Sequence, residues 1–283
     1  MSDNKQTFSC GNESIKDPVT LSFRGKEFHT GYSRITKFLS CPRSYRYTYV
    51  DGIRGEGNGA MKRGSAYHKT LEVALTFKRD KGRELSVGKC VELARYFAEQ
   101  YELTPAVVDQ VDSAVRYWHA TLYHTLDPLF IEGRFEIERN GVRLTGLIDL
   151  GETTGIVTDH KFSFETWSTD RAKKSVQPII YQWGWEDDFA KKYGVPYKRF
   201  EYHAIKTFPG VQVQRLKVYP LKEEASLWYE KQIRDVAEAM CSGIFFATPS
   251  VSECGRCEHR KRCKPATYTV RSQILGQASE EEG

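Results

Sequence analysis

The sequence predicts an α/β protein in which a mixed β-sheet core is flanked by helices and preceded by a helical insertion. Three observations support this class. The first half of the chain has helical hydrophobic spacing, an Asn-Gly turn joins two strand-like segments near the middle, and helices alternate with strands beyond it. With 283 residues, 40% of them hydrophobic, the chain can bury a core, and residues 31–270 are expected to form a single domain.

Residues 1–30 form a polar N-terminal segment, with a short strand expected near Leu21–Phe23. Ser33 is a residue type that caps helices, so a helix is predicted from there to about Leu39, and Pro42 ends or restarts it. The four glycines of residues 51–60 predict a loop. The helical part of the domain, about 61–127, is expected to hold helices at 62–79, 87–100 and 105–126.

The sheet core is expected at about residues 128–220. Asn140-Gly141 favours a tight hairpin between strands at 130–138 and 142–150, and a third strand follows at 155–162. A helix at 171–193, strands at 196–206 and 211–218, and a helix at 222–240 are then predicted. A cysteine-rich segment at about 250–265 and a flexible acidic tail at 271–283 complete the chain.

Charge and hydropathy exclude some classes of protein. The net charge is +5, from 42 basic and 37 acidic residues, which permits an anionic partner without requiring one. No run of about 18 apolar residues is present, so a membrane-spanning helix is excluded. The polar N-terminus has no signal-peptide pattern. We therefore expect a cytoplasmic protein with no membrane partner.

Basic residues gather in two places, and a solvated surface is the ordinary meaning of such clusters unless other features indicate nucleic acid. The clusters comprise Arg34, Lys37, Arg43, Arg46, Arg54, Lys62 and Arg63, and then Arg256, Arg260, Lys261, Arg262 and Lys264. The 16 tyrosines and 15 phenylalanines add capacity for stacking on bases.

Two aspartates and a lysine lie at the ends of neighbouring predicted strands. Alternate residues of a strand share a face, so Asp159 and Lys161 are expected to point the same way, and Asp149 approaches Asp159 if the strands are in register. Carboxylates are preferred ligands of Mg²⁺ and Mn²⁺. A lysine beside them can orient a water molecule and stabilise charge on a phosphate. Asp-x-Lys alone is common in surface strands, so the prediction depends on its neighbours.

Helical residues supply further candidates. Gln177 and Tyr181 are four residues apart on a predicted helix and share a face, where they could contact a phosphate or a base. His68, on the helix at 62–79, could add a nitrogen ligand to the metal. Each has an ordinary structural alternative: a partly buried tyrosine on an amphipathic helix, and a structural or solvated histidine.

The chain has seven cysteines, an odd number that disfavours a disulfide framework in a reducing compartment. The spacing Cys254-x₂-Cys257-x₅-Cys263 indicates metal or cluster ligation. Zinc, with His259 as a fourth ligand, is one interpretation. The other is an iron–sulfur site closed by the distant Cys41. The remaining thiols have no short-spaced partner and are expected to be ordinary or buried: Cys10, Cys90 and Cys241.

Six motifs then follow one another in a recognisable order. They are Ser33-x-Ile35-x-x-Phe38-x-x-Cys41-Pro42, Gly64-x-x-x-His68-x-x-Leu71-Glu72, Gly146-x-x-Asp149, Asp159-x-Lys161, Gln177-x-x-x-Tyr181 and the triplet of Cys254, Cys257 and Cys263. In this order the sequence resembles the RecB-like branch of the PD-(D/E)XK nuclease superfamily. It is most similar to the iron–sulfur members, the CRISPR-associated RecB-like exonucleases and the AddB nuclease domain. The resemblance spans about Ser33 to Pro265.

The resemblance implies a restriction-endonuclease-like core and specific roles for residues. The metal, Mg²⁺ or Mn²⁺, would be held by His68, Asp149, Asp159 and the backbone carbonyl of His160. Lys161 would position the attacking water, and Gln177 and Tyr181 would help to place the DNA strand. A structural 4Fe-4S cluster on Cys41, Cys254, Cys257 and Cys263 would join the N- and C-terminal segments. The family often has an acid upstream of Gly-x-x-Asp, for which Glu136 and Glu138 are both candidates.

Together these features predict a metal-dependent DNA nuclease, an exonuclease acting on single strands or DNA ends. CRISPR adaptation with an integrase partner, DNA repair and phage recombination are equally compatible roles. No Gly-x-x-x-x-Gly-Lys-Ser/Thr motif is present, so the enzyme acts alone or with a helicase partner. The alternatives are a non-catalytic DNA-binding or assembly subunit that keeps the fold and the cluster, and a zinc-stabilised binding module.

Overall fold

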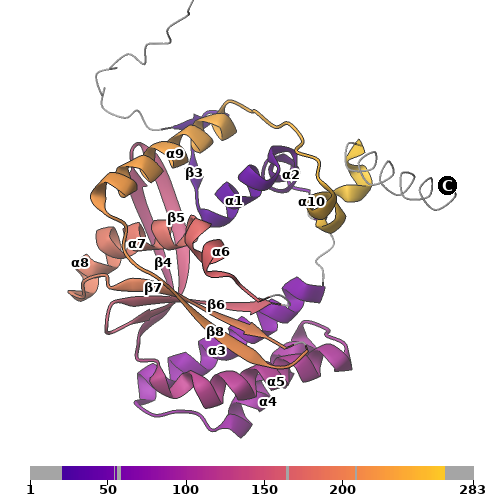
Figure 1. The fold of residues 1–283 in the computed structure, drawn as a ribbon, viewed down its shortest axis with the longest axis vertical. Coiled ribbons are helices and arrows are strands. Elements are labelled where there is room, and N and C mark those ends of the chain that lie inside the picture. Colours follow the sequence, from indigo (N-terminus) through magenta and orange to yellow (C-terminus); the bar gives the residue numbers. More distant parts are fainter. Residues whose placement is uncertain (1–20, 54, 56–58, 164–165, 208, 265–283) are drawn as a thin grey trace, which may run out of the picture.

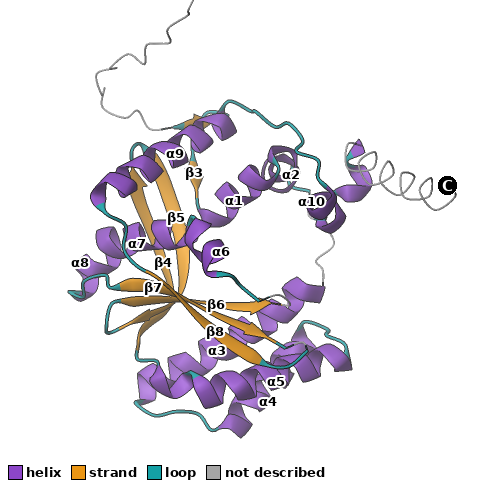
Figure 2. Ribbon diagram, viewed as in Figure 1, coloured by secondary structure: helices purple, strands orange, loops and turns teal. Residues whose placement is uncertain are grey.

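A mixed β-sheet divides the molecule into two helical layers (Figures 1 and 2). The computed structural model describes residues 21–53, 55, 59–163, 166–207 and 209–264. In this part of the chain, six strands form the main sheet, with β3, β5, β6, β7 and β8 in spatial order and β4 paired to β5. The strands are β3 (His29–Thr30), β4 (Pro128–Arg139), β5 (Val142–Glu152), β6 (Ile156–Ser163), β7 (Arg199–Lys206) and β8 (Gln212–Val218). This is the predicted α/β class.

The hairpin of β4 and β5 confirms the Asn-Gly prediction. Arg139 pairs with Val142, so the turn has two residues, and both Asn140 (φ 48°) and Gly141 (φ 69°) take the left-handed conformation. That combination is the turn whose twist matches antiparallel strands, and it favours asparagine followed by glycine. The hairpin fixes β5 at the centre of the sheet.

One face of the sheet packs on α3 (Gly59–Lys81), α4 (Val87–Gln100) and α5 (Pro105–Thr121), which lie together in Figure 1. Leu150 and Ile205 from the strands share a buried cluster with Leu71, Val115 and Trp118 from these helices. The expected helix at 105–126 ends at Thr121, and a short 3₁₀ turn, η2 (Tyr123–Thr125), leads into β4.

The other face packs on α7 (Gln177–Gly184) and α9 (Glu223–Cys241). Ile148 and Phe200 of the sheet join Ile180, Trp183 and Ile233 of these helices in the larger buried cluster. Burial of such apolar surface contributes most of the favourable free energy of folding.

The helix expected at 171–193 is instead broken into consecutive pieces. These are α6 (Thr169–Lys174), α7, the π-helical turn η3 (Trp185–Phe189) and α8 (Ala190–Tyr193). The first break falls at Ser175, whose backbone is extended (ψ 135°) and whose hydroxyl accepts a hydrogen bond from the backbone amide of Gln177. Pro178, in the first turn of α7, has no amide with which to continue a preceding helix.

The N-terminal region differs from its prediction. The strand near Leu21–Phe23 is present as β1 (Ser22–Phe23), paired with β2 (Lys26–Glu27), but β2 and β3 were not predicted. Helix α1 (Tyr32–Ser40) starts one residue before Ser33 and has Gly31 as its N-cap residue, so the predicted cap is wrong. Cys10 and the 271–283 tail lie outside the described residues.

A second, smaller unit, which we call the cysteine lobe, combines residues 32–50 with residues 247–263. It contains α1, α2 (Pro42–Tyr45), the π-helical turn η1 (Arg46–Val50), α10 (Val251–Arg256) and the 3₁₀ turn η4 (Arg260–Arg262). Its two segments are about 200 residues apart in sequence and lie side by side in Figure 1. None of the helices among the described residues is long and apolar enough to cross a membrane.

Gly31 offers a test of how closely the chain between β3 and α1 approaches the backbone of β5. A Cβ atom at Gly31 would lie within van der Waals overlap of the Thr145 carbonyl oxygen, a backbone atom that cannot rotate away. Gly31→Ala should therefore lower the free energy of unfolding by about 1–3 kcal/mol in a urea titration. Gly64 is the matched control, because a Cβ there meets nothing within 4 Å inside α3 and should stabilise by about 0.5–1 kcal/mol. Equal effects of both substitutions would contradict this packing.

Candidate active site

A gap along one edge of β5 creates the site. On this edge β3 pairs with Arg143 and Leu144, whereas β6 pairs only with Leu150 and Gly151. The intervening residues 145–149 therefore have no strand partner on this side. At the end of the gap the Asp149 carboxylate accepts a hydrogen bond from the His160 backbone amide, with 2.9 Å between N and Oδ2. A side chain thus replaces the sheet ladder and holds β5 and β6 apart.

Asp159 and Lys161 point from β6 to the same side, as their spacing predicts. The Lys161 Nζ lies 2.7 Å from Oδ2 of Asp159 and 3.0 Å from Oδ1. Asp159 is 2% exposed. Burial lowers the pKa of Lys161, but the carboxylates of Asp159 and Asp149 outweigh it and raise the pKa above the ordinary value. Lys161 is therefore a fixed cation beside the two acids.

His68 meets Asp149 from α3. The His68 Nδ1 lies 3.3 Å from Oδ2 of Asp149, whose side chain is 15% exposed. Burial, and secondly the charge of Asp159, raise the pKa of Asp149 to about 6, although His68 and Lys161 oppose the shift. Two carboxylates that disfavour each other's charge, with an imidazole beside them, form a donor set that suits a hard divalent cation.

The His160 side chain lies away from this set. Its ring is 2% exposed and sits 5.5 Å from the His203 ring, and burial followed by His203 lowers its pKa well below the ordinary value. The imidazole is therefore neutral. Only the main chain of His160 takes part in the site, consistent with a role confined to its backbone.

Gln177 and Tyr181 use their polar groups inside the protein. The Gln177 amide donates to Oδ1 of Asp159, and the Tyr181 hydroxyl donates to the carbonyl of Leu147, at 2.7 Å, within the gap of β5. Gln177 is 1% exposed and Tyr181 7% exposed. In this structure Gln177 holds Asp159 of β6 and Tyr181 holds the unpaired segment of β5. Contact of either residue with a substrate remains a prediction.

Glu132 is an acidic neighbour that sequence reasoning missed. The pairs Ile131–Leu150 and Gly133–Ile148 place Glu132 of β4 opposite Asp149. Its backbone is left-handed (φ 51°), an unusual conformation for this residue type. Burial, then the charges of Asp149 and Glu72, raise the pKa of Glu132 to about 7.

The two acids proposed from sequence for this position are elsewhere. Glu136 lies opposite Thr145 and Glu138 opposite Arg143, both further along the hairpin than Asp149. Both are exposed, and Glu136 forms an ion pair with Arg143, 3.2 Å between Nε and Oε1. Neither candidate for the upstream acid therefore lies beside Asp149, because the register of the hairpin, which the sequence alone does not give, places Glu132 there.

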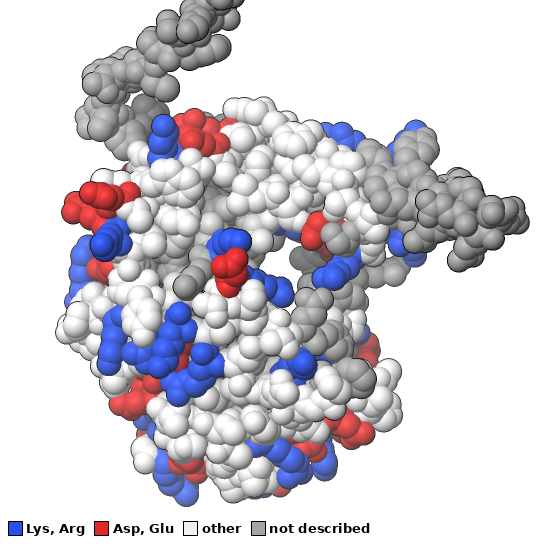
Figure 3. Space-filling view, viewed as in Figure 1, with Lys and Arg blue, Asp and Glu red and all other residues white. Residues whose placement is uncertain are grey.

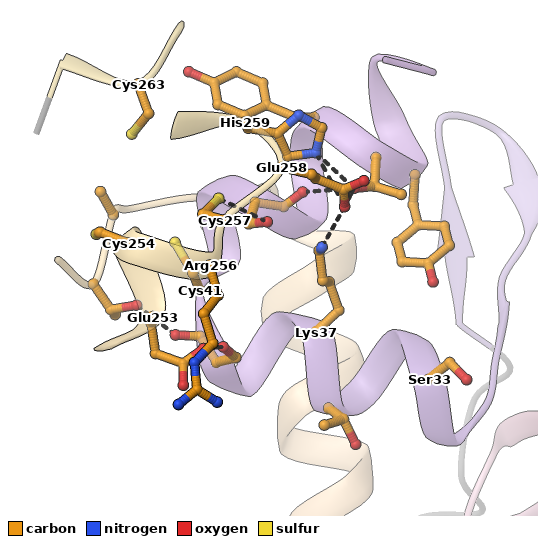
Figure 4. A pocket seen from close by; sticks show the side chains of 18 of the residues that line it. Ser33, Lys37, Cys41, Glu253, Cys254, Arg256, Cys257, Glu258, His259 and Cys263 are labelled. Atoms are coloured by element: carbon orange, nitrogen blue, oxygen red, sulfur yellow. Dashed lines mark hydrogen bonds and ion pairs between the residues drawn. The ribbon is translucent and has the colours of Figure 1, made fainter. Parts of the chain in front are cut away.

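The cysteine lobe contains a cavity of about 580 Å³ whose lining includes Cys41, Cys254, Cys257 and Cys263. The four thiols proposed as one ligand set thus share one cavity, and Figure 4 shows them at one end of it, with Ser33 at the other. As the side chains stand, no group of three or more His, Cys, Asp or Glu among the described residues is close enough to hold a metal ion. The donor type and the shared cavity fit a thiolate-bound group.

His259 bears on the zinc interpretation of the cysteine lobe, in which it would be the fourth ligand. The Nε2 atom of His259 lies 2.9 Å from the hydroxyl of Thr48, so this nitrogen is engaged away from the thiols.

Cys90 is fully buried in α4, and burial raises its pKa to about 11, which makes it an unreactive thiol. Lys and Arg form several separate patches among Asp and Glu over the face shown in Figure 3.

Polar contacts hold the two segments of the lobe together. Lys37 forms an ion pair with Glu258, with 2.6 Å between Nζ and Oε1. The hydroxyl of Ser40 donates to Glu253 at 2.9 Å. A hydrogen bond from Lys37, despite some burial, keeps the pKa of Glu258 below its ordinary value. These contacts bring α1 and α10 to the same cavity.

Two acids and a lysine, at a point where two strands of a mixed sheet separate, define a class of phosphodiester-hydrolysing enzyme. The family model of the PD-(D/E)XK nuclease superfamily matches residues 29–264, and the chain belongs to this superfamily. Membership implies a nuclease, a hydrolase of phosphodiester bonds in nucleic acid, and nucleases of this kind generally use Mg²⁺ or Mn²⁺.

One solved structure agrees at the level of the fold. The chain is similar to a crystal structure from Eubacterium rectale named "Putative exonuclease", with a TM-score of 0.54 and 11% sequence identity over 83% of this chain and 88% of that one. The crystal structure of SSO0001 is also matched, with a TM-score of 0.29 and 14% identity over 81% of this chain and 96% of that one. The comparison with curated proteins finds no match.

The raised pKa of Asp149 predicts a pH dependence of stability in the metal-free protein. The folded chain keeps this proton up to a pH of about 6, whereas the ordinary value is 3.8. Between these values the folded state binds more protons than the unfolded state, so the free energy of unfolding falls as the pH rises. Urea titrations in EDTA at pH 4.5 and 7 should show the wild type losing on the order of 1 kcal/mol relative to Asp149→Asn. Parallel pH profiles would contradict it.

Proposed function

We propose that this protein is a metal-dependent DNA exonuclease of the RecB-like type, acting on single strands or DNA ends. The observation that carries the proposal is the convergence of Asp149, Asp159 and Lys161 at the separation of β5 and β6, with a 2.7 Å contact between lysine and acid. Membership of the PD-(D/E)XK superfamily supports the chemistry, because it implies a nuclease.

The residues that would hold the metal are His68, Asp149, Asp159 and the main-chain carbonyl of His160. Their chemistry suits a divalent cation, because two largely buried carboxylates disfavour each other's charge and one of them has a raised pKa. A bound Mg²⁺ or Mn²⁺ supplies Lewis acidity toward the scissile phosphate and lowers the pKa of a water molecule. The hydrogen bond from the His160 amide keeps Asp149 oriented toward this position.

Lys161 contributes positive charge where the phosphate gains negative charge. Its ammonium group donates to Asp159 in the free protein and can donate at the same time to a water molecule or a phosphate oxygen. The Gln177 amide holds the other side of Asp159, so this carboxylate does not have to reorganise when the substrate binds. Preorganised charge of this kind is the largest contribution in many hydrolases.

Asp159→Ala should abolish cleavage while leaving the fold intact. The variant loses a metal ligand and the partner of Lys161, so the rate on end-labelled single-stranded DNA with Mg²⁺ or Mn²⁺ should fall at least about 100-fold. EDTA should have the same effect on the wild type. Asp170→Ala, which removes an exposed acid paired with Lys174 on α6, is the control and should cleave normally. Cleavage by Asp159→Ala near the wild-type rate would refute the assignment.

We also propose that Cys41, Cys254, Cys257 and Cys263 bind a structural 4Fe-4S cluster. The support is that all four line one cavity, although Cys41 and Cys254 are 213 residues apart in sequence. A cross-link over so long a loop removes conformational entropy from the unfolded chain and favours the folded state. A hydrogen bond within 3.9 Å between Ser44 and Cys257 already spans the two segments.

Cys257→Ser should lose iron and soluble yield, because one thiolate ligand is removed. The measurement is iron content and absorbance near 400 nm after anaerobic purification. Cys241→Ser is the matched control, since this thiol is partly exposed on α9 and is not one of the four. A colourless wild-type protein containing zinc would show that the cluster assignment is wrong and would favour the zinc-stabilised alternative.

The biological setting that fits this activity is the trimming of DNA ends in CRISPR adaptation, repair or phage recombination. The enzyme would act alone or with an integrase or helicase partner, and a helicase motor would have to come from the partner, since the chain has no Walker A motif. The contacts of His68 with Asp149 and of Lys161 with Asp159 disfavour the non-catalytic alternative, since they support an intact set of acids, lysine and histidine.

A further inference from the structure

Tyr32 lies where the chain passes from the main sheet into the cysteine lobe. It is the first residue of α1 and follows β3, the strand that pairs with β5 just before the gap. Gly31 is packed against the Thr145 carbonyl, at the start of the same gap. The close approach fixes the point at which the chain leaves the sheet. The Tyr32 ring is thereby placed 6.0 Å from the Lys161 ammonium group.

The same ring lines the cavity of the cysteine lobe. Tyr32 therefore connects the catalytic lysine with the approximately 580 Å³ cavity that continues toward the cysteines. From Tyr32 the lining continues along one face of α1 with small hydroxyl side chains and one lysine. These are Ser33, Thr36, Lys37 and Ser40. Figure 3 shows the surface hollowed between α1, α6 and α10, so this region is open to solvent.

Tyr32 differs from the other tyrosines of the centre in what it contacts. Tyr181 donates to the Leu147 carbonyl and Tyr202 donates to the Ser175 hydroxyl, and both are buried. Tyr32 is only partly buried, and among the described residues its hydroxyl has no hydrogen-bond partner. Apart from the Lys161 ammonium group 6.0 Å from its centre, the described residues make no polar contact with Tyr32 that would occupy its ring or hydroxyl.

We propose that Tyr32 stacks on the unpaired base next to the scissile phosphate, while Ser33, at the end of the cavity opposite the four thiols, faces the adjoining sugar–phosphate chain. This inference rests on the proposed nuclease function and names the substrate class of the same site. An aromatic ring stacks on any base regardless of sequence, but only when that base is free of its partner strand. The site is therefore built for single-stranded DNA without sequence preference.

The test measures stacking separately from cleavage. A single-stranded oligonucleotide carrying 2-aminopurine near one end is bound to the full-length Asp159→Ala protein, which does not cut it. Stacking on Tyr32 should quench the 2-aminopurine fluorescence, and adding Tyr32→Ala should abolish the quenching and weaken binding by roughly 5- to 150-fold. Tyr32→Phe should retain both properties. Tyr96→Ala, an exposed tyrosine on α4, is the control and should behave as the parent.

Two comparisons keep the proposal falsifiable. Tyr32→Leu keeps an apolar side chain but removes the aromatic ring, so a folded Tyr32→Leu protein that still quenches and binds fully would overturn stacking. A Tyr32→Phe enzyme that loses cleavage as fully as Tyr32→Ala would also overturn it, because the hydroxyl rather than the ring would then be needed. Tyr32-dependent quenching in a wild-type protein that never cleaves DNA would refute the nuclease function and leave the stacking site intact.

Discussion

The hydrogen bond from the His160 amide to Asp149 determines the geometry on which the rest of the site depends. In a regular sheet this amide would bind a backbone carbonyl of β5, and the two strands would remain in register. Here β5 and β6 share only two paired positions, after which a carboxylate takes the carbonyl's place. The strands diverge with Asp149 between them, while Asp159 is held by Lys161 of β6 and Gln177 of α7.

This geometry buries several carboxyl groups close together, which disfavours their ionised forms. The surrounding groups reduce this unfavourable free energy. Burial and mutual repulsion disfavour ionisation of Asp149, and Glu132 adds a third carboxyl with a raised pKa. Lys161 compensates part of this charge from within the site. The remaining excess of negative charge is what makes a divalent cation a natural occupant, since it stabilises all the carboxylates at once.

The sequence predicted those parts of the molecule that depend on local chemistry. Asn140-Gly141 specifies its hairpin, and strand alternation puts Asp159 and Lys161 on one side. Glu132 could not be found in this way, because its place opposite Asp149 depends on strand register. The broken helix at 171–193 was missed because its apolar pattern continues across Ser175, although Pro178 was a local signal of the break.

Helix α1 links the cysteine lobe to the catalytic centre because both of its ends are fixed by different parts of the molecule. Its start is held where Gly31 meets the Thr145 carbonyl, and its C-cap residue is Cys41, one of the thiols at the cavity. Between these points Lys37 and Ser40 are bound to the C-terminal segment. The position of Tyr32 beside Lys161 therefore depends on both ends of one short helix. A group held by the four thiols, as proposed, would act on the same helix and, through it, on the Tyr32 ring beside Lys161.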